Sequence, residues 1–185
     1  SAGGLGKIFS RMLSGEKIFQ NIYTARGDGM ITFGSSFAGR IMPVSIGPGR
    51  EMILQKSAFL AAESGVNLSI HFNQRLGAGF FGGEGFILQR LSGEGMAFAE
   101  IDGDLAEYNL APGQQLIVDT GNVAGCEPTV SMDIRQVPGL KNIMFGGEGV
   151  FNTILTGPGT VWLQTMPIYS VAMAIRPFIP TQNNN

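Results

Sequence analysis

Apolar and polar residues alternate along several short stretches of the chain. In the first stretch, Val66, Leu68, Ile70 and Phe72 alternate with polar residues. Because successive side chains of a β-strand point to opposite faces, this period of two places the apolar residues on one face of a sheet. Three stretches follow the pattern and are predicted to be strands: 66–72, 130–135 and 171–175.

One stretch near the start of the chain has a different period. Leu5, Ile8, Phe9, Met12 and Leu13 follow helical spacing, so residues 4–13 are predicted to form a short amphipathic helix. A helix of this kind can lie on a membrane surface, which gives one open hypothesis of peripheral membrane contact.

Glycine-rich tetrads separate the apolar runs. Ser-Gly-Glu-Gly at 92–95 and Thr-Gly-Pro-Gly at 156–159 each lie between two apolar stretches. Glycine supplies the positive φ that tight turns need, so both tetrads are predicted to be hairpin connections.

The chain repeats itself at an offset of 64 residues. Residues 48–100 align without a gap on 112–164, and fifteen of the 53 positions are identical. A fixed offset held over this length indicates an internal structural repeat. Identical pairs include Pro48 with Pro112, Ile53 with Ile117, Glu63 with Glu127, Val66 with Val130, and Leu91 with Leu155.

The repeat predicts how the chain is organised. Residues 48–111 and 112–175 form two units, and 176–185 form a polar tail. Residues 1–47 read as a partial unit, because 3–16 match 81–94 and end on the same Leu-Ser-Gly-Glu. We therefore expect one all-β domain over 1–185, built as a double-stranded β-helix-like barrel or sandwich from repeats of about 64 residues.

Composition limits the function classes. The 28 glycines and a charged fraction of 14% favour many short strands over a disordered chain. A net charge of −2 gives no electrostatic reason to bind nucleic acid. The single cysteine is compatible with a reducing compartment, so a cytoplasmic location is expected.

The phrase Phe-Gly-Gly-Glu-Gly occurs twice, at 81–85 and 145–149. Glu84 and Glu148 could act as an acid or a base, or they could accept hydrogen bonds from amides of a tight turn. An active site is rarely built twice in one chain, so the structural interpretation is preferred. The predicted turn motif comprises Gly82, Gly83, Glu84, Gly85, Gly146, Gly147, Glu148 and Gly149.

No catalytic or metal site is predicted from the remaining chemistry. His71 is the only histidine, so a histidine-rich metal cluster is excluded, and no cofactor is expected. Cys126 could be a nucleophile paired with His71, but Ala62 occupies the equivalent position, which favours a small apolar filler.

Aromatic residues are the remaining candidates for contacts. Trp162, Phe81 and Phe145 are predicted to contact a ligand or a neighbouring subunit. The charge-poor composition favours a non-enzymatic, homo-oligomeric scaffold or interaction protein. A small-molecule or lipid-binding module is the alternative, and an enzyme using a turn glutamate is a third hypothesis.

Several motifs resemble a known family. Residues 76–95, 111–121 and 140–167, together with Gln-Lys-Ser-Ala-Phe-Leu-Ala-Ala at 55–62, resemble the family named for altered inheritance of mitochondria. The resemblance covers about residues 5–176 and implies an all-β fold similar to that of the tryptophan RNA-binding attenuation protein. It also implies subunit assembly, with a trimer favoured, and a link to membrane organisation for the fungal member. Members usually carry more residues at the start, including a further strand region.

Overall fold

The computed structural model describes residues 20–74, 85–137 and 151–179. The chain divides into two units, Ser1–Gly34 and Ser35–Asn185, which are considered separately. In the first unit, residues 20–34 carry no regular element, and the rings of Tyr23 and Phe33 meet edge to face at 5.7 Å.

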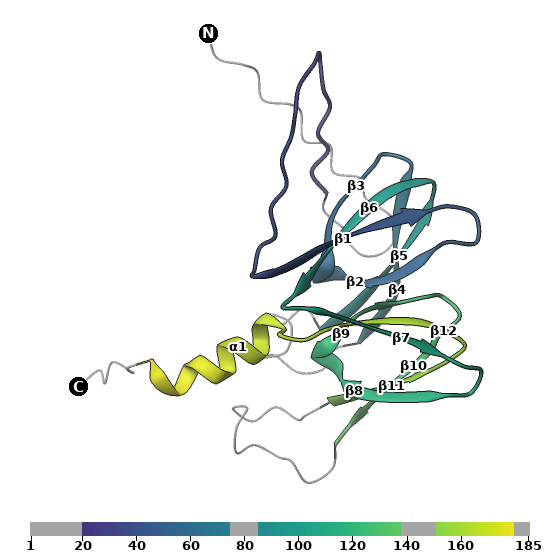
Figure 1. The fold of residues 1–185 in the computed structure, drawn as a ribbon, viewed down its shortest axis with the longest axis vertical. Coiled ribbons are helices and arrows are strands. Elements are labelled where there is room, and N and C mark those ends of the chain that lie inside the picture. The colour runs from purple at the N-terminus through teal and green to yellow at the C-terminus, as the bar shows by residue number, and fades with distance from the viewer. Residues whose placement is uncertain (1–19, 75–84, 138–150, 180–185) are drawn as a thin grey trace. The chain divides into compact units, whose positions relative to one another are not determined.

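The second unit is built from strands with one short α-helix (Figure 1). Short 3-10 turns, η1 (Lys56–Ala58), η3 (Thr120–Asn122) and η4 (Arg176–Phe178), punctuate it, and the helix is α1 (Ile168–Ile175). The strands are β1 (Gly39–Ile46), β2 (Met52–Gln55), β3 (Phe59–Ala62), β4 (Val66–Gln74), β5 (Phe86–Gly93), β6 (Gly95–Asp102), β7 (Leu105–Leu110), β8 (Gln115–Asp119), β9 (Val123–Cys126), β10 (Ser131–Gln136), β11 (Phe151–Thr156) and β12 (Gly159–Gln164).

The strands form three antiparallel sheets. One sheet has the order β4-β5-β2-β9-β12-β7, and two three-stranded sheets have the orders β1-β6-β3 and β10-β11-β8. The predicted all-β class is confirmed, and among the described residues the sheets are those of an open sandwich rather than a closed barrel. The helix predicted at 4–13 lies outside the described residues.

Strand pairing recurs at the offset of 64 residues. Leu68 faces Leu91 across β4 and β5, and Met132 faces Leu155 across β10 and β11. Ala62 faces Ala97 across β3 and β6, and Cys126 faces Val161 across β9 and β12. The pairs β1–β6 and β2–β5 correspond in the same way to β7–β12 and β8–β11. The two sets of strands therefore share one pairing scheme.

Two apolar clusters fill the sandwich. One gathers Ile53, Phe86, Leu88, Cys126 and Leu155, and the other gathers Ile46, Met52, Leu54, Leu91 and Ile101. Neighbouring residues on β2 enter different clusters, because successive side chains of a strand point to opposite faces.

Two glutamates hold the corners where the chain changes sheet. The Glu63 carboxylate accepts from the Met96 amide at 2.7 Å, and the Glu127 carboxylate accepts from the Thr160 amide at 2.8 Å. Gly95 precedes the first amide with φ 145°, and Gly159 precedes the second with φ 137°. A Cβ at either glycine would lie about 3 Å from the facing carboxylate, at 2.9 Å and 3.0 Å respectively, so both corners need glycine.

These corners correct the hairpin prediction for 92–95 and 156–159. β5 and β6 belong to different sheets, as do β11 and β12, so the tetrads lead the chain from one sheet to another. Glycine signals a sharp change of direction, but it does not specify that the flanking strands pair with each other.

The strand predicted at 171–175 is also wrong, because this stretch forms α1. Alternation of Val171, Met173 and Ile175 with alanine is equally compatible with a helix that is apolar on most sides. No residue of α1 is buried. None of the described helices is long and apolar enough to cross a bilayer.

The corner carboxylates predict a stability effect. Glu127→Ala should lower the free energy of unfolding by about 1–2 kcal/mol, since it leaves the Thr160 amide without a charged acceptor. Glu63→Ala should cost less, because its hydrogen bond is exposed to water. Urea denaturation measures both effects. Glu94→Ala, an exposed change in the same corner, is the control, and an equal loss in all three variants would contradict the assigned role.

Candidate functional site

Most of the predicted turn motif lies outside the described residues. Phe81, Gly82, Gly83 and Glu84 fall there, as does the whole second copy from Phe145 to Gly149. Only Gly85 is described, and it is buried with φ 88°. A positive φ fits the expected turn geometry at this position, while the roles of Glu84 and Glu148 stay predictions.

Trp162 lies on β12 between two strands. It faces Glu107 on β7 and Gly125 on β9. Its indole Nε1 donates to the Glu107 carboxylate at 2.8 Å, and its ring is partly buried against the cluster of Met52 and Leu54. A Cβ at Gly125 would lie 2.6 Å from the Ile53 carbonyl oxygen, so this glycine permits the close approach of β2. These contacts are all within the chain, so a ligand or subunit contact by Trp162 stays a prediction.

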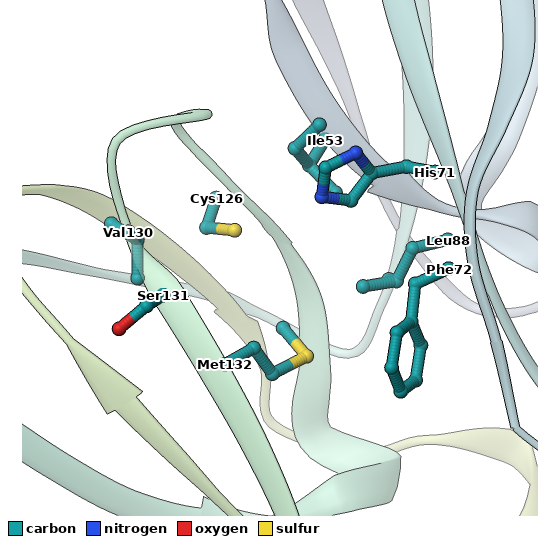
Figure 2. A pocket seen from close by; sticks show the side chains of 8 residues that line it. All are labelled: Ile53, His71, Phe72, Leu88, Cys126, Val130, Ser131 and Met132. Carbon is teal, nitrogen blue, oxygen red and sulfur yellow. The ribbon is translucent and has the colours of Figure 1, made fainter.

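A pocket of about 120 Å³ lies where β4 and β10 approach the junction of β2 and β9 (Figure 2). Its walls are mostly apolar, with the His71 imidazole and the Cys126 thiol as polar groups, while the Ser131 hydroxyl points away from the other lining side chains (Figure 2). The pocket therefore brings together His71 and Cys126, which lie 55 positions apart in the chain. The lining residues are Ile53, His71, Phe72, Leu88, Cys126, Val130, Ser131 and Met132.

The electrostatics of this pocket oppose nucleophilic chemistry. Burial, and then the nearby Glu127 carboxylate, raise the pKa of the Cys126 thiol from its ordinary 9.0 to about 12. Burial, and then the Arg90 guanidinium, lower the pKa of His71. A catalytic cysteine needs the opposite arrangement, with a lowered thiol pKa beside a positive group. The filler interpretation of Cys126 accounts for its burial in the core.

Residues 20–74, 85–137 and 151–179 contain no group of three histidine, cysteine, aspartate or glutamate side chains placed to hold an ion.

Among the described residues, β8 and β3 are unpaired on one side, each at the edge of a three-stranded sheet, and the sequence analysis did not predict this. β8 is the last strand of one small sheet, and its Ile117 is 61% exposed. Ile53, its counterpart 64 residues earlier, is 1% exposed: its side chain packs in the apolar cluster of Phe86 and Leu88, and β9 pairs with its strand. The 64-residue alignment contained this pair of isoleucines, but it could not say which of them has a neighbouring strand.

The edge strand β3 of the other small sheet is also less buried than its counterpart. All four residues of β9 are buried, whereas all four of its counterpart β3 are only partly buried. β3 is the last strand of the other small sheet. An apolar strand at the edge of a sheet offers unpaired backbone groups to another chain. The two edges are therefore the candidate interaction surfaces.

The thiol pKa predicts low reactivity of Cys126. At pH 8, iodoacetamide should label the native protein at least about 100-fold more slowly than the urea-unfolded chain, because the buried thiol stays protonated. Mass spectrometry after timed quenching measures the rates, with Cys126→Ala as the blank. Comparable rates in the two states would contradict the burial of the thiol.

Comparisons with known proteins give a family from one source and a similar fold from another. A solved crystal structure of a Streptococcus pyogenes protein matches with a TM-score of 0.63 and 22% identity, over 78% of this chain and 62% of that one. The chain thus spans less than two thirds of that protein, and the likeness bears on fold alone. No curated protein matches the chain. The family model described as "Mitochondrial biogenesis AIM24" matches residues 1–166. The chain belongs to the mitochondrial biogenesis AIM24 family.

Proposed function

We propose that this protein is a non-enzymatic, homo-oligomeric scaffold, with a trimer as the favoured assembly. One observation carries the proposal: Ile117 is largely exposed on an edge strand where its counterpart Ile53 is fully covered. Burying a large aliphatic side chain contributes about 1.5–3 kcal/mol, so an assembly that covers this edge is favoured.

The edge strand β8 has few of the residues that discourage pairing with another strand. Edge strands are commonly blunted by lysine, proline or inward-pointing charges. β8 reads Gln-Leu-Ile-Val-Asp, so its one charge lies at its last residue, Asp119. That carboxylate accepts from the Gly121 amide at 2.9 Å, which orients it toward η3. The centre of the strand is left apolar, which favours contact with another chain.

The chemistry of the pocket supports a non-enzymatic role. The one histidine and the one cysteine of the chain both line it, yet the thiol is held protonated. A link to membrane organisation, which the family resemblance implies for the fungal member, belongs to this proposal as the process that such a scaffold would serve.

A second candidate function, a small-molecule-binding module, is favoured by the pocket. Its volume of about 120 Å³ is comparable to an engineered apolar cavity of roughly 150 Å³ that binds benzene. Since the His71 pKa is lowered, the imidazole is neutral at pH 7, and a neutral ligand about the size of one aromatic ring fits best.

Assembly predicts a mass above that of one chain. Light scattering should give about three times the 19.6 kDa of a single chain, and Ile117→Lys should shift the protein to monomers by placing a charge on the apolar edge. Tyr108→Lys, at a 45% exposed site on the edge strand β7, is the matched control and should leave the mass unchanged. A monomeric wild-type protein would refute the proposed scaffold.

The pocket predicts a bound molecule that a filling variant removes. Native mass spectrometry should detect a small co-purified compound, and Met132→Trp should release it by occupying the pocket. Met166→Trp, an exposed change outside the lining, should retain it. The small-molecule hypothesis fails if the wild-type protein is empty, or if both variants retain the compound equally.

A further inference from the structure

The pocket brings together three side chains that bind soft metal ions. His71, Cys126 and Met132 all line it. Figure 2 shows the His71 ring and the Cys126 sulfur turned toward each other, with the Met132 side chain reaching into the same space. Thiolate, thioether and imidazole groups are the ligands that Cu(I) prefers in proteins. The single histidine excludes a histidine-rich cluster, but a soft ion accepts sulfur in place of further nitrogen.

A β-bulge directs His71 into the pocket. The register between β4 and β5 shifts between Ile70 and Phe72, so His71 is the extra residue of the bulge. In a regular strand His71 and Phe72 would point to opposite faces, yet both line the pocket. The corresponding strands β10 and β11 pair regularly through Arg135, the counterpart of His71. The imidazole therefore owes its position to a local irregularity that β10 does not share.

Both sulfur-bearing residues differ from their counterparts in the repeat. At the offset of 64 residues, Cys126 corresponds to Ala62 and Met132 corresponds to Leu68, on strands with equivalent partners. Alanine and leucine therefore satisfy the same strand pairing without sulfur. The two sulfur atoms supply something that the pairing of the repeat does not require, and they supply it in one pocket.

The donor atoms are not engaged with other side chains. Among the described residues, neither the His71 imidazole nor the Cys126 thiol has a hydrogen-bond partner. Cys126 is 2% exposed, whereas His71 and Ser131 are exposed, so the pocket leads from the surface to the thiol. A metal site needs such an entry path as well as its ligands.

The apolar walls favour a monovalent ion. Cu(I) with one thiolate, a neutral imidazole and a thioether forms a complex without net charge, and burial in apolar surroundings penalises a net charge. Burial, and then the Arg90 guanidinium, lower the pKa of His71, so its imidazole is neutral at pH 7. A divalent ion such as Zn²⁺ would leave a net positive charge in the pocket, near Arg90.

We propose that this pocket is a Cu(I) site, with Cys126 Sγ, the facing His71 ring nitrogen and Met132 Sδ as its three ligands. Binding forms a copper–sulfur bond, releases the thiol proton to water and changes no oxidation state. A thiol that is a poor nucleophile can still be a ligand, because the ion replaces the proton and neutralises the thiolate. The inference goes beyond the scaffold function and does not depend on assembly.

Anaerobic competition for Cu(I) tests the site in the full chain. Cu(I) is supplied as its coloured complex with bicinchoninate, and loss of the colour measures transfer to the protein. The wild-type protein should take one ion per chain. Cys126→Ala should weaken binding at least about 100-fold and His71→Gln at least about 10-fold, since loss of an outer-shell partner alone costs about 10–100-fold. Met132→Leu should weaken it about 10-fold, because a thioether is the weakest of the three ligands.

The variants are chosen to keep the fold. Cys126→Ala and Met132→Leu introduce the residues that the repeat already carries at these positions, and circular dichroism checks each variant. Met52→Leu is the matched control, because Met52 is 1% exposed in the other apolar cluster, and its affinity should equal that of the wild-type protein.

X-ray absorption of the loaded protein identifies the ligands. The wild-type spectrum should show one nitrogen and two sulfur neighbours, and Met132→Leu should remove one sulfur. Equal affinity in the wild-type protein and Cys126→Ala overturns the proposal. So does binding that His71→Gln and Met132→Leu both leave unchanged, because the ion is then held by the thiol alone. The mass measured by light scattering is a separate readout, so failure of the copper site leaves the scaffold proposal standing.

Discussion

The pairing of β2 with β9 is the constraint on which the described fold depends. Every other pair among the described strands lies within one of the two recurring sets, so the two facing residue pairs between β2 and β9 connect the sets edge to edge. The junction also divides the core, because Ile53 contributes to one apolar cluster and its neighbour Leu54 to the other. The short strand β2 therefore takes part both in the backbone pairing between the two sets and in the packing of both apolar clusters.

The same junction determines the chemistry of the pocket. Ile53 and Cys126 face each other across β2 and β9, and both line the cavity near His71. Their burial raises the thiol pKa and contributes to the apolar surroundings of the imidazole. Cys126 is therefore a poor nucleophile at the place where it stabilises the contact between the repeats. The loss of water that favours its packing also disfavours the charged thiolate.

Sequence alone predicted the strand-rich class, the strands at 66–72 and 130–135, and the location of sharp bends at 92–95 and 156–159. These depend on local signals, namely alternation and glycine. It could not predict that the bends change sheet, or that 171–175 is helical, since local pattern does not determine strand partners and a short apolar stretch suits either element. Glu63 and Glu127 appeared in the alignment as identical residues, but their carboxylate–amide contacts required the positions of β6 and β12.

The exposure of Ile117 was beyond sequence reasoning for a more general reason. A repeat encodes the same surface at each occurrence, and whether that surface is covered depends on what stands next to it. Ile53 and Ile117 have the same side chain, lie on equivalent strands and pair equivalently with β5 and β11. Among the residues that the structure describes, however, only the strand of Ile53 has a further strand beside it. The centre of β8 carries no charge, and β3 is apolar and only partly buried, so neither strand has the lysine, proline or inward-pointing charge that usually discourages contact along a sheet edge.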